Sequence, residues 1–220
     1  MFAISHAATA LVLERRYPEV PMPWLLLSVQ ASELLWVVLN LMGVESTTTE
    51  PVVHAVGDIH LAHMPFSHSA LGAIVLSIAG AAIAWIATRR ARFAAAIGLG
   101  VASHFVLDVL THAPDLALHP GSRVMLGIDL YGSWPLAAFA LELGYGVLAW
   151  RIHRGDWRLL AAIVFFNVTS LSFFVPGIPG PEELLAGRPT FVVLLVAVQI
   201  VVTLTVVGLL RRRRVIAPAT

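Results

Sequence analysis

Six apolar runs divide most of this chain into segments that are each about as long as a bilayer core is thick. They cover residues 23–44, 67–88, 92–111, 134–152, 158–176 and 190–210. A transmembrane helix needs about 20 predominantly apolar residues to cross the hydrocarbon core. A seventh run, residues 2–13, is long enough only for a thin span or a half-span. The pattern predicts an all-α fold, a polytopic membrane helix bundle with six long transmembrane helices plus one short N-terminal helix.

The composition argues against a water-soluble fold. Of the 220 residues, 58% are hydrophobic and only 12% are charged, whereas soluble domains carry about 25% charged residues. A soluble fold of this length could not bury so much apolar surface. The chain has no cysteine, which excludes disulfide and thiolate chemistry. We therefore expect a single transmembrane domain over residues 1–220 that contacts membrane lipid and does not bind nucleic acid.

The basic residues are distributed unevenly between the two ends of these segments. All 14 are arginine, and only Arg123 and Arg188 lie on the side opposite to the C-terminal cluster at residues 211–214. Because arginine-rich ends stay in the cytoplasm, we expect a cytoplasmic C-terminus and an outer N-terminus, in the cytoplasmic membrane of a bacterium or archaeon. The outer face then receives the long loops, residues 45–66, 112–133 and 177–189.

The sharpest polar motif lies at the end of the run 92–111. His104, Asp108 and His112 are spaced four residues apart, so on a helix they form one polar stripe. Ionisable residues inside a membrane are costly and indicate a functional site by default. A carboxylate and an imidazole at this spacing can bind one divalent ion together. The competing interpretation is a buried Asp–His hydrogen bond, or a pair that reaches the outer interface.

A second polar motif, His-Met-Pro-Phe-Ser-His-Ser at residues 63–69, lies at the start of the preceding apolar run. A serine at this place can cap the helix that follows, which requires no functional role. His68 lies in the first turn of that helix. The two runs are joined by a short turn and are therefore antiparallel neighbours, so we expect His68 at the depth of Asp108.

Further ionisable residues are expected within the bilayer or close to its outer face. His6 lies in the short first run and Glu33 near the middle of the run 23–44; the structural alternative for Glu33 is a neutral acid hydrogen-bonded between helices. Glu142 is a weaker candidate of the same kind, and His153 is expected in a solvated cytoplasmic turn. The residues expected to surround and support the metal ligands are His63, Ser67, Asp58, His60 and Thr111.

These motifs resemble the YdjM-like family of predicted membrane-bound metal-dependent hydrolases. His6 matches the family's early histidine, and Glu33 is the nearest match to an acidic motif in its second helix. Residues 63–69 are similar to its His-Arg-Gly-x-Thr-His-Ser motif, and residues 100–111 fit its Gly-x-x-Ser-His-x-x-x-Asp-x-x-Thr motif fully. The resemblance covers roughly residues 1–120. Two departures stand out: Met-Pro replaces Arg-Gly in the first motif, and a paired-aspartate motif is reduced to a single glutamate.

The resemblance implies a membrane-embedded metal-dependent hydrolase with its site near the outer membrane face. Zinc is the expected ion, because imidazole and carboxylate donors suit it and no thiolate is present. Glu33 or His112 is the expected general base, and a lipid or lipid-linked ester is the expected substrate. The expected metal ligands are His68, His104 and Asp108, completed by His6 or Glu33.

Two other classes of function are compatible with the same residues. An ion or small-solute transporter uses intramembrane Asp, Glu and His side chains as relays, and a structural membrane protein uses them to join helices. Metal analysis of the purified protein separates the hydrolase from the structural protein. Flux in liposomes identifies the transporter.

Overall fold

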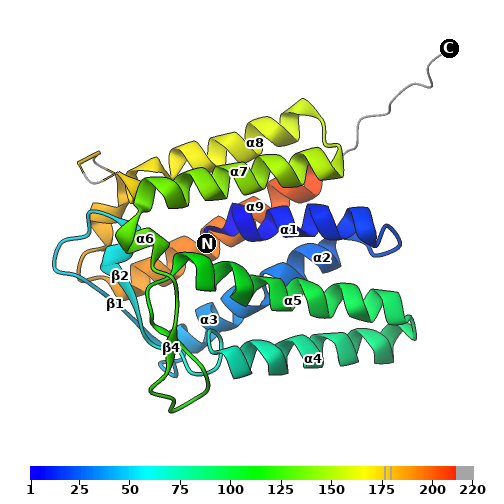
Figure 1. Ribbon diagram of the computed structural model, residues 1–220, viewed down its shortest axis with the longest axis horizontal. Helices are drawn as coiled ribbons and strands as arrows, with labels where there is room; N and C mark the ends of the chain where they lie inside the picture. Colours follow the sequence, from blue (N-terminus) through cyan, green and yellow to red (C-terminus); the bar gives the residue numbers. More distant parts are fainter. Residues whose placement is uncertain (176, 179, 212–220) are drawn as a thin grey trace.

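The computed structural model describes residues 1–175, 177–178 and 180–211, so Arg211 is the one member of the C-terminal arginine cluster within it. The chain forms a helix bundle with two small antiparallel sheets at one end (Figure 1). The helices are α1 Ala3–Arg16, α2 Met22–Val29, α3 Ala31–Leu41, α4 Ala70–Thr88, α5 Ala91–Thr111, α6 Leu130–Ser133, α7 Pro135–His153, α8 Trp157–Thr169 and α9 Pro189–Leu210. The strands are β1 Ser46–Thr49, β2 Ile59–His63, β3 Leu116–Ala117 and β4 Met125–Leu126, and short 3-10 turns cover Val56–Asp58, Leu171–Phe174 and Pro181–Leu185.

Three of the described helices, α4, α5 and α9, are long and apolar enough to cross a membrane. The pair α2 and α3 passes the same test but is bent by 54°, and counts as a fourth span if it crosses as one. α7 has 19 residues but is less apolar because it carries Glu142 and Arg151, and α8 has only 13 residues. The prediction of six long transmembrane helices is therefore not confirmed within the described residues. The prediction of an all-α fold also left out the two small sheets.

The run 23–44, expected as one helix, forms two. The break falls at Gln30, whose backbone is not helical (φ −109°, ψ 6°). The Gln30 side chain is fully buried, and its Nε2 atom donates to the carbonyl oxygen of Ala3, 2.9 Å away. The break in the second segment is thus tied to the first turn of α1.

α1 lies inside the bundle and packs against α2, α5, α7, α8 and α9 (Figure 1). Its Ala7, Ala8 and Ala10 side chains are buried, and such small residues let neighbouring helices approach closely. Its 14 residues reach about 21 Å, less than a full span, which agrees with the prediction for this segment. α1 therefore begins part-way along the bundle, beside the last turns of α5.

α4 forms an outer wall of the bundle and presents an apolar face to its surroundings. Ile74, Ile78 and Ile83 are 56%, 65% and 68% exposed. Within α4 the polar Ser77 donates its hydroxyl proton to the carbonyl oxygen of Gly98 in α5, so it turns toward a protein neighbour. An exposed face of this kind is suited to contact with lipid tails.

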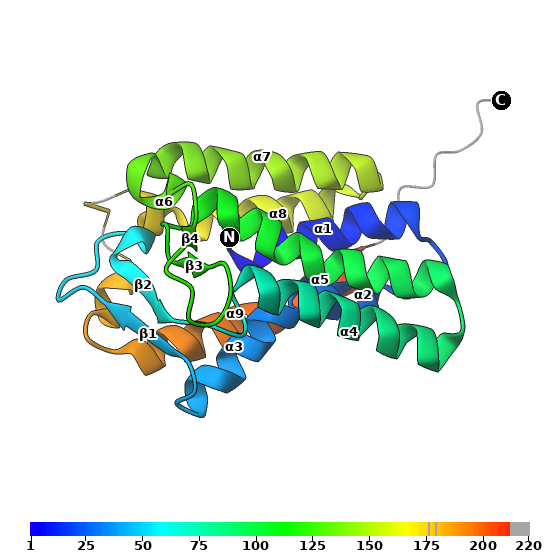
Figure 2. The ribbon, with the colours of Figure 1, turned by 60° about the horizontal axis from the view of Figure 1, so that its bottom comes forward.

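The two ends of the bundle differ in character. The turns between α4 and α5 and between α7 and α8 lie at one end, together with the C-terminal ends of α1 and α9, and the two sheets lie toward the other (Figures 1 and 2). At the first end the Nε atom of Arg92 donates to Glu19 at 2.6 Å, and Arg211 donates to Glu14 at 2.7 Å. Within the described residues, the arginines that the sequence assigns to one side of the membrane thus lie at one end of the molecule.

His153 lies at this arginine-rich end but is not solvated, which corrects the expectation from the sequence. Its side chain is fully buried, with Nδ1 3.3 Å from a Glu14 oxygen and Nε2 2.9 Å from the carbonyl oxygen of Arg211. The ends of α1 and α9 cover the turn that carries it. No residue near His153 in the sequence signals this burial, because both covering segments are distant along the chain.

Candidate metal centre

Asp108 lies at the centre of a buried cluster of imidazole and carboxylate groups. It is in α5, one turn after His104, and both residues are 1% exposed. Its Oδ2 atom lies 3.1 Å from Nε2 of His104 and 3.7 Å from Nε2 of His68. Its Oδ1 atom lies 3.2 Å from Nε2 of His6. The two sequence motifs, one on α5 and one at the start of α4, therefore meet at this carboxylate.

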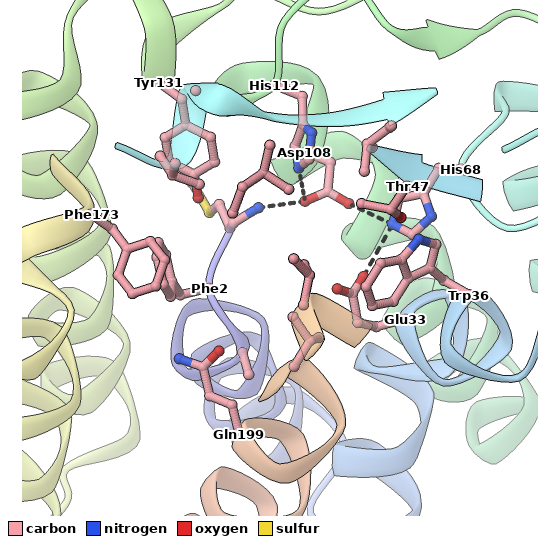
Figure 3. A pocket seen from close by; sticks show the side chains of 18 of the residues that line it. Phe2, Glu33, Trp36, Thr47, His68, Asp108, His112, Tyr131, Phe173 and Gln199 are labelled. Carbon is pink, nitrogen blue, oxygen red and sulfur yellow. Dashed lines mark hydrogen bonds and ion pairs between the residues drawn. The ribbon is translucent and has the colours of Figure 1, made fainter. Parts of the chain in front are cut away.

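Glu33 closes the cluster from the first turn of α3. Its Oε2 atom lies 3.1 Å from Nε2 of His68 (Figure 3). The same atom lies 3.2 Å from Nε2 of His104. The Glu33 side chain is 19% exposed, which makes it less covered than the other members of the cluster. It stands in the position of a ligand to the same ion as His68 and His104.

The orientation of His104 is fixed by a backbone group. Its Nδ1 atom lies 2.8 Å from the carbonyl oxygen of Val29. A carbonyl oxygen can only accept a hydrogen bond, so Nδ1 carries the proton. In the neutral imidazole, Nε2 is then an unprotonated acceptor directed at Glu33 and Asp108. Metal-binding histidines in proteins are usually held in this way by a partner on the other ring nitrogen.

Hydrogen bonds that run from Glu45 through Ser67 fix the orientation of the His68 ring in the same manner. The Ser67 hydroxyl donates to Oε2 of Glu45 at 2.5 Å, and Nδ1 of His68 lies 2.8 Å from that hydroxyl oxygen. Because Ser67 has given its only proton to Glu45, Nδ1 of His68 donates to Ser67. The Nε2 atom of neutral His68 therefore also presents a lone pair to the cluster.

With neutral histidines, the positive charge at the cluster is that of the Met1 ammonium group, 2.6 Å from Oδ1 of Asp108, and the Glu33 side of the cluster has none. With both histidines neutral, two Nε2 lone pairs face carboxylate oxygens of Glu33 and Asp108 at 3.1–3.7 Å, with no proton between them. Buried like-charged or lone-pair contacts of this kind are unfavourable unless a proton or a cation lies among them. A divalent cation would supply that charge, and the ligand atoms of Glu33, His68 and His104 lie within 4.8 Å of one another.

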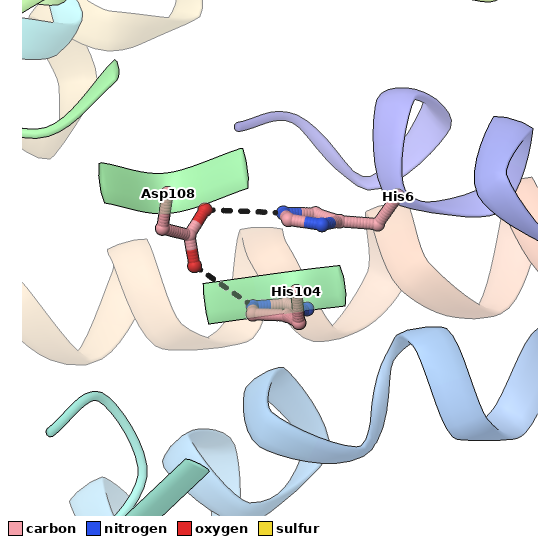
Figure 4. A group of neighbouring side chains, drawn as sticks. All are labelled: His6, His104 and Asp108. Carbon is pink, nitrogen blue, oxygen red and sulfur yellow. Dashed lines mark ion pairs between the residues drawn. The ribbon is translucent and has the colours of Figure 1, made fainter. Parts of the chain in front are cut away.

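His6 approaches the same cluster from α1. Its ring stacks on that of His104, with centroids 3.8 Å apart and planes at 8°. The side chain is 1% exposed, and among the described residues neither ring nitrogen has a hydrogen-bond partner. Nε2 is directed at Oδ1 of Asp108 (Figure 4). A fully buried imidazole without hydrogen bonds is rare in a native protein and calls for a ligand.

A cavity of about 130 Å³ adjoins the cluster. His6, Glu33, His68 and Asp108 are among the residues that line it, and Figure 3 shows Glu33, His68 and Asp108 gathered on one side of it. Most of the remaining wall is apolar and is contributed by Phe2, Trp36, Leu61, Phe173, Leu185, Val192, Leu195 and Val196. The arrangement joins a polar, metal-compatible surface to a compartment suited to an apolar group.

His112 and Asp115 line the cavity at the end of α5. Nε2 of His112 lies 3.9 Å from Oδ1 of Asp108, and Nδ1 lies 3.9 Å from Oδ1 of Asp115. Burial lowers the pKa of His112 to about 3, and burial raises the pKa of Asp115 to about 6. The pKa of the neighbouring Tyr131 hydroxyl is raised by burial and by the Glu142 carboxylate, to which it donates at 2.5 Å.

The structure brings some of the expected supporting residues to the cluster and leaves others outside it. Ser67 bonds to His68, as described above, and Thr111 is buried one turn after Asp108, to whose carbonyl oxygen it donates at 3.4 Å. His60 instead pairs with Glu50 at the surface, with the two side chains 42% and 54% exposed. Asp58 accepts backbone N–H groups in its own loop, and His63 is exposed at the end of β2.

Glu45 is a member of the site that the sequence analysis did not single out. It is 2% exposed, and besides the Ser67 hydroxyl it accepts the backbone N–H groups of Phe66 and Ser67, each at 2.9 Å. It therefore holds the segment that carries His68. The available signal was its position directly after an apolar run, but its partner lies 22 residues further along the chain.

A comparison with protein families identifies one match. The family model of the YdjM inner membrane protein covers residues 24–177. This range includes Glu33, His68, His104 and Asp108, while His6 lies before it. No curated protein and no solved structure matches the chain. Because the family model covers more than half of the sequence, and the described helices include membrane-spanning candidates, the chain belongs to the YdjM inner membrane protein family.

Proposed function

We propose that this protein is a membrane-embedded metal-dependent hydrolase whose substrate is a lipid or a lipid-linked ester. The observation that carries the proposal is the orientation of His68 and His104. The second ring nitrogen of each is bonded elsewhere, to Ser67 and to the Val29 carbonyl. Both Nε2 atoms are thus available to one cation between them and the two carboxylates.

The donor set favours zinc among the common ions. His68, His104, Glu33 and Asp108 offer two imidazole nitrogens and two carboxylate oxygens, and neighbouring donor atoms are 3.1–3.7 Å apart. Donors bound at 2.0–2.1 Å to a tetrahedral zinc ion are about 3.3 Å from one another. Glu33, expected from the sequence either as a general base or as the ligand that completes the set, is assigned as a ligand in this proposal.

A bound zinc ion supplies Lewis-acid polarisation of an ester carbonyl and an activated water at neutral pH. The protein must then provide a proton carrier and a place for the substrate. His112 lines the cavity beside the cluster, 3.9 Å from Oδ1 of Asp108, and is not one of the four side chains assigned to zinc. It is therefore assigned as the general base.

The apolar cavity wall supports a lipid-like substrate. Trp36, Phe173, Val192 and Val196 lie along it, and aliphatic and aromatic side chains of this kind bind hydrocarbon chains by excluding water. Of the described residues that line the cavity, none is arginine. A substrate recognised chiefly by its apolar part fits this wall better than a small phosphate ester does.

Elemental analysis and an esterase assay test the proposal together. Detergent-purified wild-type protein is expected to contain stoichiometric zinc and to hydrolyse p-nitrophenyl palmitate. Asp108→Asn is expected to lose both. Glu142→Gln is the matched control, because Glu142 is an equally buried carboxylate that bonds to Tyr131 and Ser5 outside the cluster. Stoichiometric metal that survives both Asp108→Asn and His104→Ala would exclude these residues as ligands.

The transporter interpretation predicts a different result. Protein reconstituted in liposomes would then mediate cation or proton flux that depends on Glu33 and Asp108, with no ester hydrolysis in detergent. Flux without hydrolysis would replace the hydrolase proposal.

A further inference from the structure

The two carboxylate oxygens of Asp108 face two different histidines. Oδ2 lies 3.1 Å from Nε2 of His104, and Oδ1 lies 3.2 Å from Nε2 of His6 (Figure 4). The two imidazole rings are stacked almost in parallel, 3.8 Å apart. Each oxygen therefore forms a separate pair with one ring, and the two pairs lie side by side.

The stacking distance of the two rings is compatible with a two-metal centre. In hydrolytic enzymes with two ions, the ions are about 3.5–4 Å apart, which is the separation of the two stacked rings. Two cations, each held by one of these Nε2 atoms and one oxygen of the shared carboxylate, would be separated by a similar distance. The ligand atoms of His6, His104 and Asp108 lie within 4.8 Å of one another, so one ion could contact both rings, but it would use only one of the two carboxylate oxygens that face them.

The chemistry of His6 supplies independent support. Its ring is fully buried and, within the described part of the chain, neither nitrogen has a hydrogen-bond partner. The first cation position uses Glu33, His68, His104 and Oδ2 of Asp108, which leaves His6 without a role. A cation beside Oδ1 would give Nε2 of His6 a ligand bond and leave only Nδ1 of that ring without a partner among the described residues.

The second position also has room for ligands other than protein side chains. His6, His112 and Asp108 all line the cavity, and Nε2 of His112 lies 3.9 Å from the same Oδ1 atom. The Met1 nitrogen contacts Oδ1 at 2.6 Å, and a cation at this position would replace that contact. Its remaining coordination sites would face the cavity, where substrate and water enter.

We propose that Asp108 bridges two divalent cations, one held with Glu33, His68 and His104 and the other with His6. This rests on the proposed function in one respect only, that the cluster binds metal. The ligand class is a first-row divalent cation such as Zn²⁺ or Mn²⁺, since the donors are imidazole nitrogen and carboxylate oxygen.

The number of metal ions bound per chain tests the two cation positions without any assay of activity. Chelator-stripped protein reloaded with Zn²⁺ alone is expected to bind two ions per chain by elemental analysis. His6→Gln is expected to bind one. His153→Gln serves as the matched control, since His153 is an equally buried histidine at the far end of the bundle, and it should retain two ions.

Loading with Mn²⁺ gives a second measurement, in which the spectrum of the wild-type protein is sufficient to test the proposal. Two bridged Mn²⁺ ions give an exchange-coupled electron paramagnetic resonance spectrum, whereas one ion gives the six-line spectrum of an isolated ion. The coupled spectrum is expected in wild-type protein and the isolated one in His6→Gln. One ion per chain in wild type, with an uncoupled spectrum, would overturn the second position and leave the proposed function intact. No bound ion in wild type would overturn both.

Discussion

The Nδ1 atom of His104 lies 2.8 Å from the carbonyl oxygen of Val29, the last residue of α2. In an unbroken helix that carbonyl would accept the amide of Glu33, four residues later. The break at Gln30 releases it, because carbonyl groups in the last turn of a helix have no intrahelical partner. The same break starts α3, whose first turn carries Glu33. One interruption thus orients a histidine and places the carboxylate that faces it.

Ser67→Ala is expected to weaken zinc binding by about 10- to 100-fold, the usual effect of removing a partner behind a metal-binding histidine. The variant removes the hydroxyl that accepts from Nδ1 of His68, so the ring loses its fixed tautomer. Competition with a chelator of known affinity measures the change. Ser77→Ala is the control, since it removes a helix-to-helix hydroxyl bond of similar length away from the cluster. Equal zinc affinity in wild type and Ser67→Ala would show that the Glu45–Ser67–His68 connection does not support the metal.

Gly100→Ala is expected to destabilise the bundle by about 1–3 kcal/mol, the usual range for overpacking. A Cβ atom at this position would collide with the Ser28 hydroxyl and lie 2.9 Å from the Ser28 Cβ atom. Removing that side chain in the double variant Ser28→Gly/Gly100→Ala is expected to recover stability relative to Ser28→Gly alone. Thermal melts in detergent measure both steps.

Gly144→Ala is the control for this substitution, because nothing lies within 4 Å of its added Cβ. It is expected to melt at or above the wild-type temperature. If Gly100→Ala has the melting temperature of wild type, α2 and α5 can move apart without loss of stability. The close approach at Gly100 is then not needed to bring Val29 to His104.

The polar stripe on α5 could be predicted because it depends on helical periodicity alone, and His104 and Asp108 do form a pair one turn apart. The approach of His68 could be predicted from the short turn that makes α4 and α5 antiparallel. The break at Gln30 was not predicted, since residues 23–44 are apolar enough on average to be expected as one helix. At the break, the buried Gln30 side chain bonds to the backbone of Ala3, in another helix. Glu45 was missed for the same reason: its partners are brought to it by the return of the β1–β2 segment.

The predicted orientation can be tested by cysteine labelling, because the chain has no cysteine of its own. His54 lies exposed in the loop between β1 and β2, and Arg158 is exposed at the start of α8, at the opposite end of the bundle. A membrane-impermeant maleimide is expected to label His54→Cys in intact cells stripped of any outer barrier, and Arg158→Cys only after lysis. The reverse pattern would place the candidate metal centre on the cytoplasmic side.

The stability of the metal-free protein is expected to depend on pH through Asp115. Burial raises the pKa of this carboxyl from 3.8 to about 6, so between these values the folded protein binds a proton that the unfolded chain has released. The stability linked to Asp115 therefore falls as pH rises from about 4 to about 6. Above pH 6 the full destabilisation caused by the buried, ionised carboxylate is present.

Asp115→Asn removes this ionisation and keeps an oxygen that can accept the backbone N–H of Leu61, as Asp115 does at 3.4 Å. In chelator-treated protein the variant is expected to melt above wild type at pH 7.5 and close to it at pH 4. Three imidazoles interact with this carboxyl: His60 and His68 through their charge, and His112 at 3.9 Å. All three are present in both proteins, so their titration affects the two melting temperatures alike. A melting difference of the same size at both pH values would mean that the substitution acts through packing or hydrogen bonding, and that a buried, ionised Asp115 does not limit stability at neutral pH.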